Sequence, residues 1–217
     1  MLILATAATK ATEIGLGSLI LAGGWLMIPL AALLGVSIFI FVERFNMIRK
    51  ASVHDPRFMV KIKDLMQAGE VNKAKSYCYS KNTPIARMIE KGISQLGRPI
   101  NDINHSIENM GNLEVSRLEK GLPFLATIAG GAPMIGFLGT VIGMVQAFMN
   151  LSEAGGGVDM ALLSSGIYTA MITTVAGLVV GIPSYFGYNF LVARIEQLIF
   201  QMEANTMAFM EIINPKS

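Results

Sequence analysis

Charged residues are scarce in this chain, and three long stretches have none. Only 15% of the 217 residues are Asp, Glu, Lys or Arg, whereas soluble domains average about 25%. No charged residue occurs in residues 14–42, 121–152 or 160–193. Since a spanning helix needs about 20 mostly apolar residues, each stretch is long enough to cross a bilayer. Leu26–Val42 and Val175–Pro183 are apolar on almost every side, unlike a soluble helix with a single apolar stripe.

Cysteine and histidine are also rare, and their scarcity excludes two kinds of chemistry. Cys78 is the only cysteine, so the chain has no intramolecular disulfide, and a free thiol without a role is the simplest interpretation. His54 and His105 lack metal-ligand spacing. The sequence also has no nucleotide-binding loop and no nucleophile–base constellation. We therefore predict no enzyme activity, no metal, no cofactor and no nucleic-acid partner.

The first apolar stretch differs from a secretory signal peptide. Lys10 is the only cation before it, and Glu13 follows that lysine. A signal peptide has a basic start and a shorter apolar core. We expect this stretch to be a retained transmembrane helix.

Lysine and arginine are concentrated between the first and second apolar stretches. Glu43–Lys120 holds 14 Lys or Arg and 9 Asp or Glu, whereas Asn150–Asp159 has two acidic residues and no cation. Because cationic loops stay in the cytoplasm, the middle region is predicted to be cytoplasmic and the short connection to lie outside. Three spans then place the N-terminus outside and the C-terminus in the cytoplasm.

These patterns predict an all-α protein with three transmembrane helices, whose long helices extend into a helical cytoplasmic region. The expected segments are an outer N-terminal segment with amphipathic character (1–18), transmembrane helix 1 (19–42), the cytoplasmic region (43–120), transmembrane helix 2 (121–150), a short outer loop (151–161), transmembrane helix 3 (162–193) and a cytoplasmic C-terminal helix (194–217).

The middle region has the signals of several short helices. Helix starts are expected at Asp55-Pro56 and Thr83-Pro84. Breaks between helices are expected near Gly69, Gly92, Gly97 and Pro99. Since about 80 residues are too few for a large independent core, we expect a helical extension of the membrane bundle.

Glycine recurs in the second and third apolar stretches at spacings that suit close helix packing. Small residues four positions apart let helix backbones approach each other in a membrane. The predicted packing residues are Gly136, Gly139, Gly143, Gly177, Gly181 and Pro133. Such packing indicates a tight bundle or an oligomer.

Hydroxyl side chains form a stripe in the third apolar stretch. Ser165, Thr169 and Thr173 are spaced i, i+4 and i+8, so they share one helix face, and Thr174 adjoins them. Each threonine alone could bond its own helix or a neighbour, worth about 0.6 kcal/mol on average. The whole stripe favours a wall that contacts water, a polar partner or an ion.

No Asp, Glu, Lys, Arg or His lies in any of the three predicted spans. Proton relays through membranes normally use such residues, and hydroxyl groups do not titrate near neutral pH. If ions cross the membrane here, the titratable group must come from another polypeptide.

Two motifs resemble a known family. GAPMIGFLGTVIGM (Gly131–Met144) and GIYTAMITTVAGLVVGIP (Gly166–Pro183), followed by Tyr188-Asn189, closely resemble the MotA/TolQ/ExbB proton-channel family, and the ExbB and TolQ branch fits best. The resemblance is strongest over roughly 60 residues, and the order of spans and cytoplasmic segments extends it over nearly the whole chain.

The resemblance implies a homopentamer in the bacterial inner membrane, with the N-terminus in the periplasm and the second and third spans around a central pore. A dimer of single-span ExbD- or TolR-like subunits would sit in the pore and supply one membrane aspartate each. Proton flow would rotate one component against the other and drive a TonB- or TolA-like protein that reaches the outer membrane. Thr140 and Thr174 occupy the positions of the family's pore threonines, which face that aspartate. The predicted pore-lining residues are Thr140, Thr174, Thr169, Thr173 and Ser165.

Thr169 departs from the family pattern, because ExbB and TolQ commonly have a glutamate at its position. Flagellar MotA-type members manage without that glutamate. Either the carboxylate is dispensable or this pore differs in ion access, so sodium stays an alternative to the proton.

Several functions therefore stay open. An ExbB-like role in TonB-dependent transport is the leading hypothesis, with a TolQ-like role in outer-membrane integrity and cell division or a MotA-like stator as its alternatives. A membrane scaffold without an ion path would use the threonines only for packing. A small-solute permease is disfavoured, since the sequence has no internal repeats.

Overall fold

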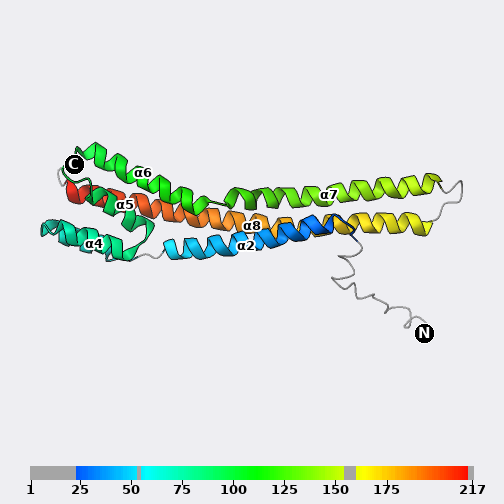
Figure 1. The fold of residues 1–217 in the computed structure, drawn as a ribbon, viewed down its shortest axis with the longest axis horizontal. Coiled ribbons are helices and arrows are strands. Elements are labelled where there is room, and N and C mark those ends of the chain that lie inside the picture. The colour runs from blue at the N-terminus through cyan, green and yellow to red at the C-terminus, as the bar shows by residue number, and fades with distance from the viewer. Residues whose placement is uncertain (1–22, 53–54, 154–159, 215–217) are drawn as a thin grey trace, which may run out of the picture. The chain divides into compact units, whose positions relative to one another are not determined.

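The computed structural model describes residues 23–52, 55–153 and 160–214, and its regular elements there are all α-helices (Figure 1). They are α2 (Met27–Ala51), α3 (Phe58–Gln67), α4 (Val71–Lys81), α5 (Pro84–Ile93), α6 (Ile100–Glu119), α7 (Leu122–Glu153) and α8 (Met160–Ile213). The predicted N-terminal segment (1–18) and most of the predicted outer loop (151–161) lie outside the described residues.

Three stretches of the described chain are long and apolar enough to cross a membrane. They are Met27–Ala51, Ile100–Ser152, which takes in α6 and α7, and Leu163–Ile213. The described residues therefore confirm an all-helical fold with three candidate transmembrane helices.

The first of these helices, α2, includes most of the predicted transmembrane helix 1 (19–42), whose first residues lie outside the described part of the chain. Gly24 has a φ of +68°, and the Met27 N–H donates to its carbonyl at 3.2 Å. This turn places the start of α2 at Met27, and the helix runs past Val42 to Ala51. Pro29 lies in the first turn, where a backbone N–H would have had no intrahelical acceptor.

The starts of the short middle helices follow their capping residues, with one shift. Thr83 caps α5, because its hydroxyl accepts from the Ala86 N–H at 3.3 Å. Asp55 instead accepts from the Arg57 N–H at 3.1 Å, and α3 begins only at Phe58. The Asp55 carboxylate therefore closes a turn before the helix and does not cap the helix itself.

The break predicted near Gly92 falls one residue later, since α5 includes Gly92 and ends at Ile93. A Cβ on Gly92 would lie 2.7 Å from both Ile107 Cδ1 and Phe209 Cε1. Glycine is needed at this position for packing against other helices, while Gly97, with a φ of +93°, makes the turn toward α6.

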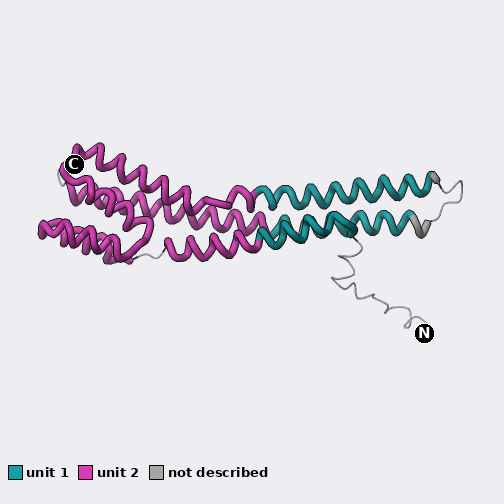
Figure 2. The backbone as a smooth tube through the Cα atoms, in the orientation of Figure 1, with its two compact units in different colours: residues 1–37, 127–183 teal, residues 38–126, 184–217 magenta. Residues whose placement is uncertain are grey.

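The helices divide between two compact units, which Figure 2 colours separately. Unit 1 comprises Met1–Ser37 and Thr127–Pro183, and unit 2 comprises Ile38–Ala126 and Ser184–Ser217. In unit 1, parts of α2, α7 and α8 enclose a small core of Leu30, Ile128, Ala132 and Val180. Many other apolar side chains of unit 1 are exposed, such as Met134, Phe137 and Met171. Apolar surface of this kind is suited to contact lipid or other subunits.

Unit 2 contains the larger apolar core. Helix α5 packs against α4 and α6, and α4 packs against α3. Buried side chains from α2, α7 and α8, including Ile48, Leu125, Leu198 and Phe209, complete the same cluster. The middle region of the sequence thus shares its core with parts of the long helices.

A buried carboxylate connects the turn between α4 and α5 to α6. Glu114 is 2% exposed and binds Arg87 through two contacts, of 2.9 Å to Nε and 2.5 Å to Nη2. Arg117 Nη1 also donates to Glu114, at 2.8 Å, and Arg87 Nη1 donates to the Asn82 carbonyl at 2.9 Å. A buried charge without partners is costly. The ion pairs with Arg87 and Arg117 offset this cost for the Glu114 carboxylate.

Cys78 is expected to resist thiol reagents in the folded protein. The side chain is 1% exposed, and desolvation, with a smaller contribution from the charge of Glu90, raises its pKa to about 12. At pH 8 the reactive thiolate is then a tiny fraction of the total. Ellman's reagent should label native protein at least about a hundredfold more slowly than guanidinium-unfolded protein. Equal labelling rates in the two states would contradict the burial of this thiol.

Candidate functional site

The backbones of α7 and α8 approach each other closely along unit 1, where the two helices lie side by side (Figure 2). A Cβ on Gly177 would lie 2.5 Å from the Ala132 carbonyl oxygen, and one on Gly136 would lie 2.7 Å from the Thr173 carbonyl oxygen. Real Cβ atoms do not approach backbone oxygens so closely, so both positions require glycine. A Cβ on Gly143 would likewise lie only 2.8 Å from the Ala170 Cβ.

Pro133 extends this contact toward the next turn of α8. Proline has no N–H, so it leaves the carbonyl four residues earlier, that of Ala129, without its helical donor. A Cβ on Gly181 would lie 2.5 Å from Pro133 Cγ and 2.9 Å from the Ala129 oxygen. The proline ring and the freed carbonyl therefore both face the bare backbone at Gly181.

Three threonine hydroxyls surround one backbone carbonyl at this interface. The Gly136 oxygen lies 3.1 Å from Thr174 Oγ1, 3.2 Å from Thr173 Oγ1 and 3.4 Å from Thr140 Oγ1. The Ala170 oxygen accepts from Thr173 at 2.7 Å and lies 3.2 Å from Thr140 Oγ1. Thr140 and Thr174 are also hydrogen-bonded directly to each other.

Both hydroxyl protons of the Thr140–Thr174 pair are donated to oxygens within this network. If Thr140 donates to Thr174, then Thr174 donates to the Gly136 carbonyl. If Thr174 donates to Thr140, then Thr140 donates to the carbonyl of Ala170 or of Gly136. Each hydroxyl has one proton and two lone pairs. In both arrangements the pair has lone pairs left over but no free proton. It can therefore accept a hydrogen bond from a further ligand but cannot donate one.

The other predicted pore residues lie in different surroundings. Thr173 is 3% exposed, and its hydroxyl bonds two backbone carbonyls between α7 and α8. Thr169 and Ser165, one and two turns earlier in α8, are half-buried and exposed respectively. Neither belongs to the network around Gly136. The structure therefore joins Thr140, Thr173 and Thr174, and leaves Thr169 and Ser165 beside them on α8.

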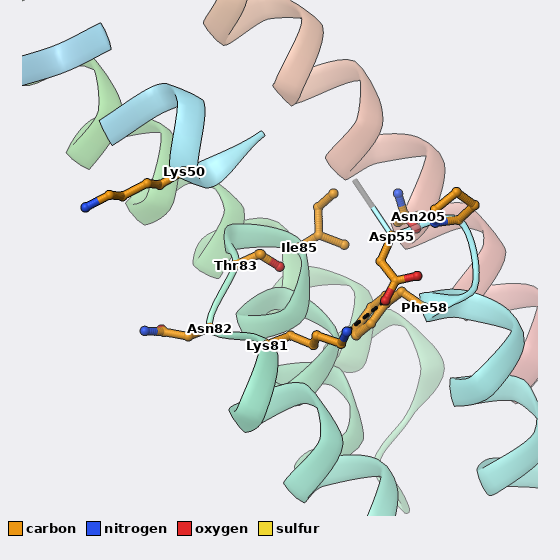
Figure 3. Close-up of a pocket in the computed structure, with 9 residues that line it drawn as sticks. Lys50, Asp55, Phe58, Lys81, Asn82, Thr83, Ile85 and Asn205 are labelled. Carbon is orange, nitrogen blue, oxygen red and sulfur yellow. Dashed lines mark hydrogen bonds and ion pairs between the residues drawn. The ribbon is translucent and has the colours of Figure 1, made fainter. Parts of the chain in front are cut away.

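A second polar site lies in unit 2. Asp55 and Lys81 form an ion pair of 2.8 Å at a pocket of about 460 Å³ (Figure 3). The hydrogen bond from Lys81 lowers the pKa of Asp55, and the same bond raises the pKa of Lys81. Each group is thus held in its charged form and is poorly suited to proton transfer. Exposed pairs of this kind contribute little stability.

The described residues contain no group of three His, Cys, Asp or Glu side chains that could hold a metal ion. His105 pairs with Glu108 at 3.4 Å on the exposed side of α6. This contact is an ordinary i, i+3 pair on a helix surface.

Residues 80–204 match the MotA/TolQ/ExbB proton channel family. The match covers more than half of the chain, and the chain belongs to this family. A putative biopolymer transport protein ExbB homolog of Methanothermobacter thermautotrophicus is 31% identical over 182 residues, which are 83% of this chain and 64% of that protein. The Tol-Pal system protein TolQ of Haemophilus influenzae is 41% identical over 87 residues, 40% of this chain and 38% of TolQ.

The biopolymer transport protein ExbB of Aquifex aeolicus is 39% identical over 87 residues, which are 40% of this chain and 58% of that protein. The chain thus spans less than two thirds of the length of each of these three relatives. Together the matches confirm the predicted ExbB/TolQ type. They identify a multi-pass membrane protein of a family of channel and transport proteins that are not enzymes.

Sequence reasoning did not find the carbonyl groups of Gly136 and Ala170 as parts of the site. Every residue has a carbonyl, so composition and spacing cannot single one out. The available signal was indirect: glycine at 136 allows α8 to come near enough for its hydroxyls to reach the backbone of α7.

Proposed function

We propose that this chain is the ExbB-like subunit of a motor driven by the proton-motive force. Five copies would surround a dimer of ExbD-like single-span subunits and energise TonB-dependent transport across the outer membrane. The observation that carries the proposal is the Thr140–Thr174 pair, an acceptor site in a transmembrane region that has no charged residue of its own. The similarity to TolQ keeps a TolQ-like role in outer-membrane integrity as the second candidate.

The proposed placement is the bacterial inner membrane, with the N-terminus in the periplasm and the C-terminus in the cytoplasm. Arg49 and Lys50 in the last turn of α2 support this orientation, because cationic residues flanking a span stay on the cytoplasmic side. Protons would then leave the pore on the side of unit 2.

The threonine pair supports a mechanism in which the protein distinguishes two charge states of a partner's aspartate. A protonated carboxyl has an O–H that can donate to the lone pairs of Thr140 or Thr174. An ionised carboxylate is acceptor-only, so it would have to take a hydroxyl proton away from a backbone carbonyl. The pair therefore favours the protonated acid, and proton loss weakens the interaction.

An ion-driven motor needs such a difference between the protonated and the ionised aspartate. A ligand shifts a conformational equilibrium only as far as its affinity for the two conformations differs. Each elementary charge that crosses a potential of 100 mV supplies about 2.3 kcal/mol. Proton binding from one side and release to the other would move the aspartate from the pair of one subunit to the pair of the next.

We assign the predicted pore residues two roles. Thr140 and Thr174, with Thr169 and Ser165 beside them, would line the ion path, and Thr173 would hold α7 against α8. Thr169 carries no charge where ExbB and TolQ commonly have glutamate. Its hydroxyl oxygen can accept from a protonated acid or contact a sodium ion, so the identity of the ion must be tested directly.

The test is ion flux in proteoliposomes that contain the chain alone or co-purified with its single-span partner. A potassium gradient with valinomycin imposes the potential, and a trapped pH dye reports proton entry. We expect proton flux only with the partner, its loss when the partner's membrane Asp is changed to Asn, and no change when choline replaces sodium.

Three results would contradict the proposal. Proton flux through the chain alone would place the titratable group in this polypeptide. An absence of ion flux with the intact partner would favour the scaffold hypothesis, and flux that requires sodium would replace the proton with sodium as the coupling ion.

A further inference from the structure

Unit 2 contains a second polar pocket, of about 470 Å³, which lies next to the site in Figure 3 and shares two of its lining residues. The pocket is formed by the second half of α2, the turn between α4 and α5, the last turns of α6 and Lys120. Figure 3 shows the shared residues, Lys50 and Asn82, with both side chains directed away from the Asp55–Lys81 ion pair.

The charges that line this pocket are mostly positive. Five of the lining residues are cations and two are carboxylates. Both carboxylates have arginine partners: Glu114 binds Arg87 and Arg117, and Glu43 binds Arg44 at 2.9 Å. Lys50 and Lys120 have no ion-pair partner among the described residues. The pocket thus has a surplus of positive charge that its own acids do not neutralise.

A buried arginine lines the same pocket with a donor that is not used. Arg44 is 6% exposed; its Nη1 donates to the Arg117 carbonyl at 3.2 Å, and its Nη2 donates to Glu43. Its Nε has no hydrogen-bond partner. A buried donor normally has an acceptor, and a guanidinium presents its N–H groups as a rigid fork that suits phosphate oxygens.

The position of these residues in the chain places the pocket at the edge of the bilayer. Arg44 follows the uncharged stretch 14–42 by two residues, and Lys120 directly precedes the uncharged stretch 121–152. The same part of α2 exposes Phe39 and Val42, which are 68% and 50% exposed. Cations at the end of an apolar surface match a lipid, with its charged headgroup joined to acyl chains.

We propose that this pocket binds the phosphate of an anionic phospholipid. Lys50 and Lys120 contact the phosphate oxygens, the buried guanidinium of Arg44 adds positive charge beside them, and the acyl chains lie along the exposed apolar side of α2. A soluble phosphate shares the headgroup chemistry but gains nothing from Phe39 and Val42. The lipid is therefore the occupant that uses both the charged and the apolar features.

The test uses the full-length protein, delipidated in an uncharged detergent. Phosphatidylglycerol and phosphatidylcholine with identical acyl chains are added separately, and retained lipid is counted by native mass spectrometry. We expect strong preference for phosphatidylglycerol, and a roughly tenfold loss of its retention in the K50Q/K120Q variant, since each lysine near an anionic headgroup contributes a several-fold factor.

The matched control is K63Q/K91Q, which removes two exposed lysines outside the pocket and changes the net charge equally. K63Q/K91Q should retain as much phosphatidylglycerol as the unaltered protein. This lipid should raise the thermal stability of K63Q/K91Q and of the unaltered protein, but not that of K50Q/K120Q. Equal retention by the two double variants, or equal retention of the two lipids, overturns the proposal. Inorganic phosphate alone is the third probe: stabilisation by phosphate that equals that of the lipid and needs Lys50 and Lys120 overturns the assignment to a lipid.

Discussion

Replacing Thr140 with Ala together with Thr174 with Val should abolish ion-driven activity while the protein still folds and assembles. The double variant removes both hydroxyls that share a hydrogen bond at the α7–α8 interface, and with them the acceptor site for a protonated acid. Thr173 remains and donates to the carbonyls of Gly136 or Ala170, so the contact between the helices should survive. Proton uptake by proteoliposomes with the single-span partner should fall to the level of empty vesicles.

The comparison for this experiment is Ser165→Ala, which removes a hydroxyl that we place along the ion path but outside the network around Gly136. Its effect on proton uptake should be small beside that of the double variant. Size-exclusion chromatography of both variants with the partner checks that assembly is intact. If the double variant assembles and its proton uptake stays within twofold of the unaltered complex, the threonine pair has no part in the mechanism.

Gly177→Ala should destabilise the protein by about 1–3 kcal/mol, the usual cost of overpacking. The added methyl group would lie 2.5 Å from the Ala132 carbonyl oxygen and 3.1 Å from Gly136 Cα. Both neighbours are backbone atoms, so a side-chain rotation cannot relieve the clash, and α7 must move away from α8. That movement also separates Thr174 from the Gly136 carbonyl, so activity should fall together with stability.

Gly130→Ala is the control for this substitution. Gly130 also lies within a helix of unit 1, but a Cβ there has no neighbour within 4 Å. Alanine is favoured over glycine in a helix, so the midpoint of unfolding in detergent should stay the same or rise. A loss of stability as large as that of Gly177→Ala would mean that the close approach at Gly177 is not the cause.

The transmembrane architecture could be predicted from the sequence because bilayer thickness imposes a long uncharged run on every spanning helix. Helix ends were less predictable. The turn at Gly24 places the start of α2 at Met27, and α2 continues beyond Val42, since nothing in Glu43–Ala51 breaks a helix. Gly92 lies one residue before the end of α5 and also makes room between helices. Only the positions of Ile107 and Phe209 reveal this second use, because glycine can serve either purpose.

The candidate site could be predicted in part. Thr140 and Thr174 were found through the family motif, and the helix period placed Thr173 with Thr169 and Ser165. That period describes one helix and not its neighbour, so it could not show that Thr173 is buried against α7 while Ser165 is exposed. The spacing of glycines predicted close packing but not which carbonyl the hydroxyls would reach.

The polar groups of unit 2 were the least predictable. In the sequence, Arg44 and Glu114 were only two of the 23 charged residues of Glu43–Lys120 (14 Lys or Arg and 9 Asp or Glu). Their burial follows from chain segments far apart in sequence: Glu114 binds Arg87, 27 positions away, and Arg44 reaches the Arg117 carbonyl, 73 positions away. The sequence shows which charged residues are present but not which of them form ion pairs.

The burial of Cys78 has a practical consequence for mapping the pore. Because the only sulfhydryl of the chain is enclosed by α4 and its neighbours, the natural protein already behaves as a background without accessible cysteine. New cysteines at Ser165, Thr169 or Tyr168 can therefore be modified selectively by membrane-impermeant reagents added to one face of the membrane. Labelling of these cysteines from one face or the other would then map the proposed ion path, and the native thiol would need no change.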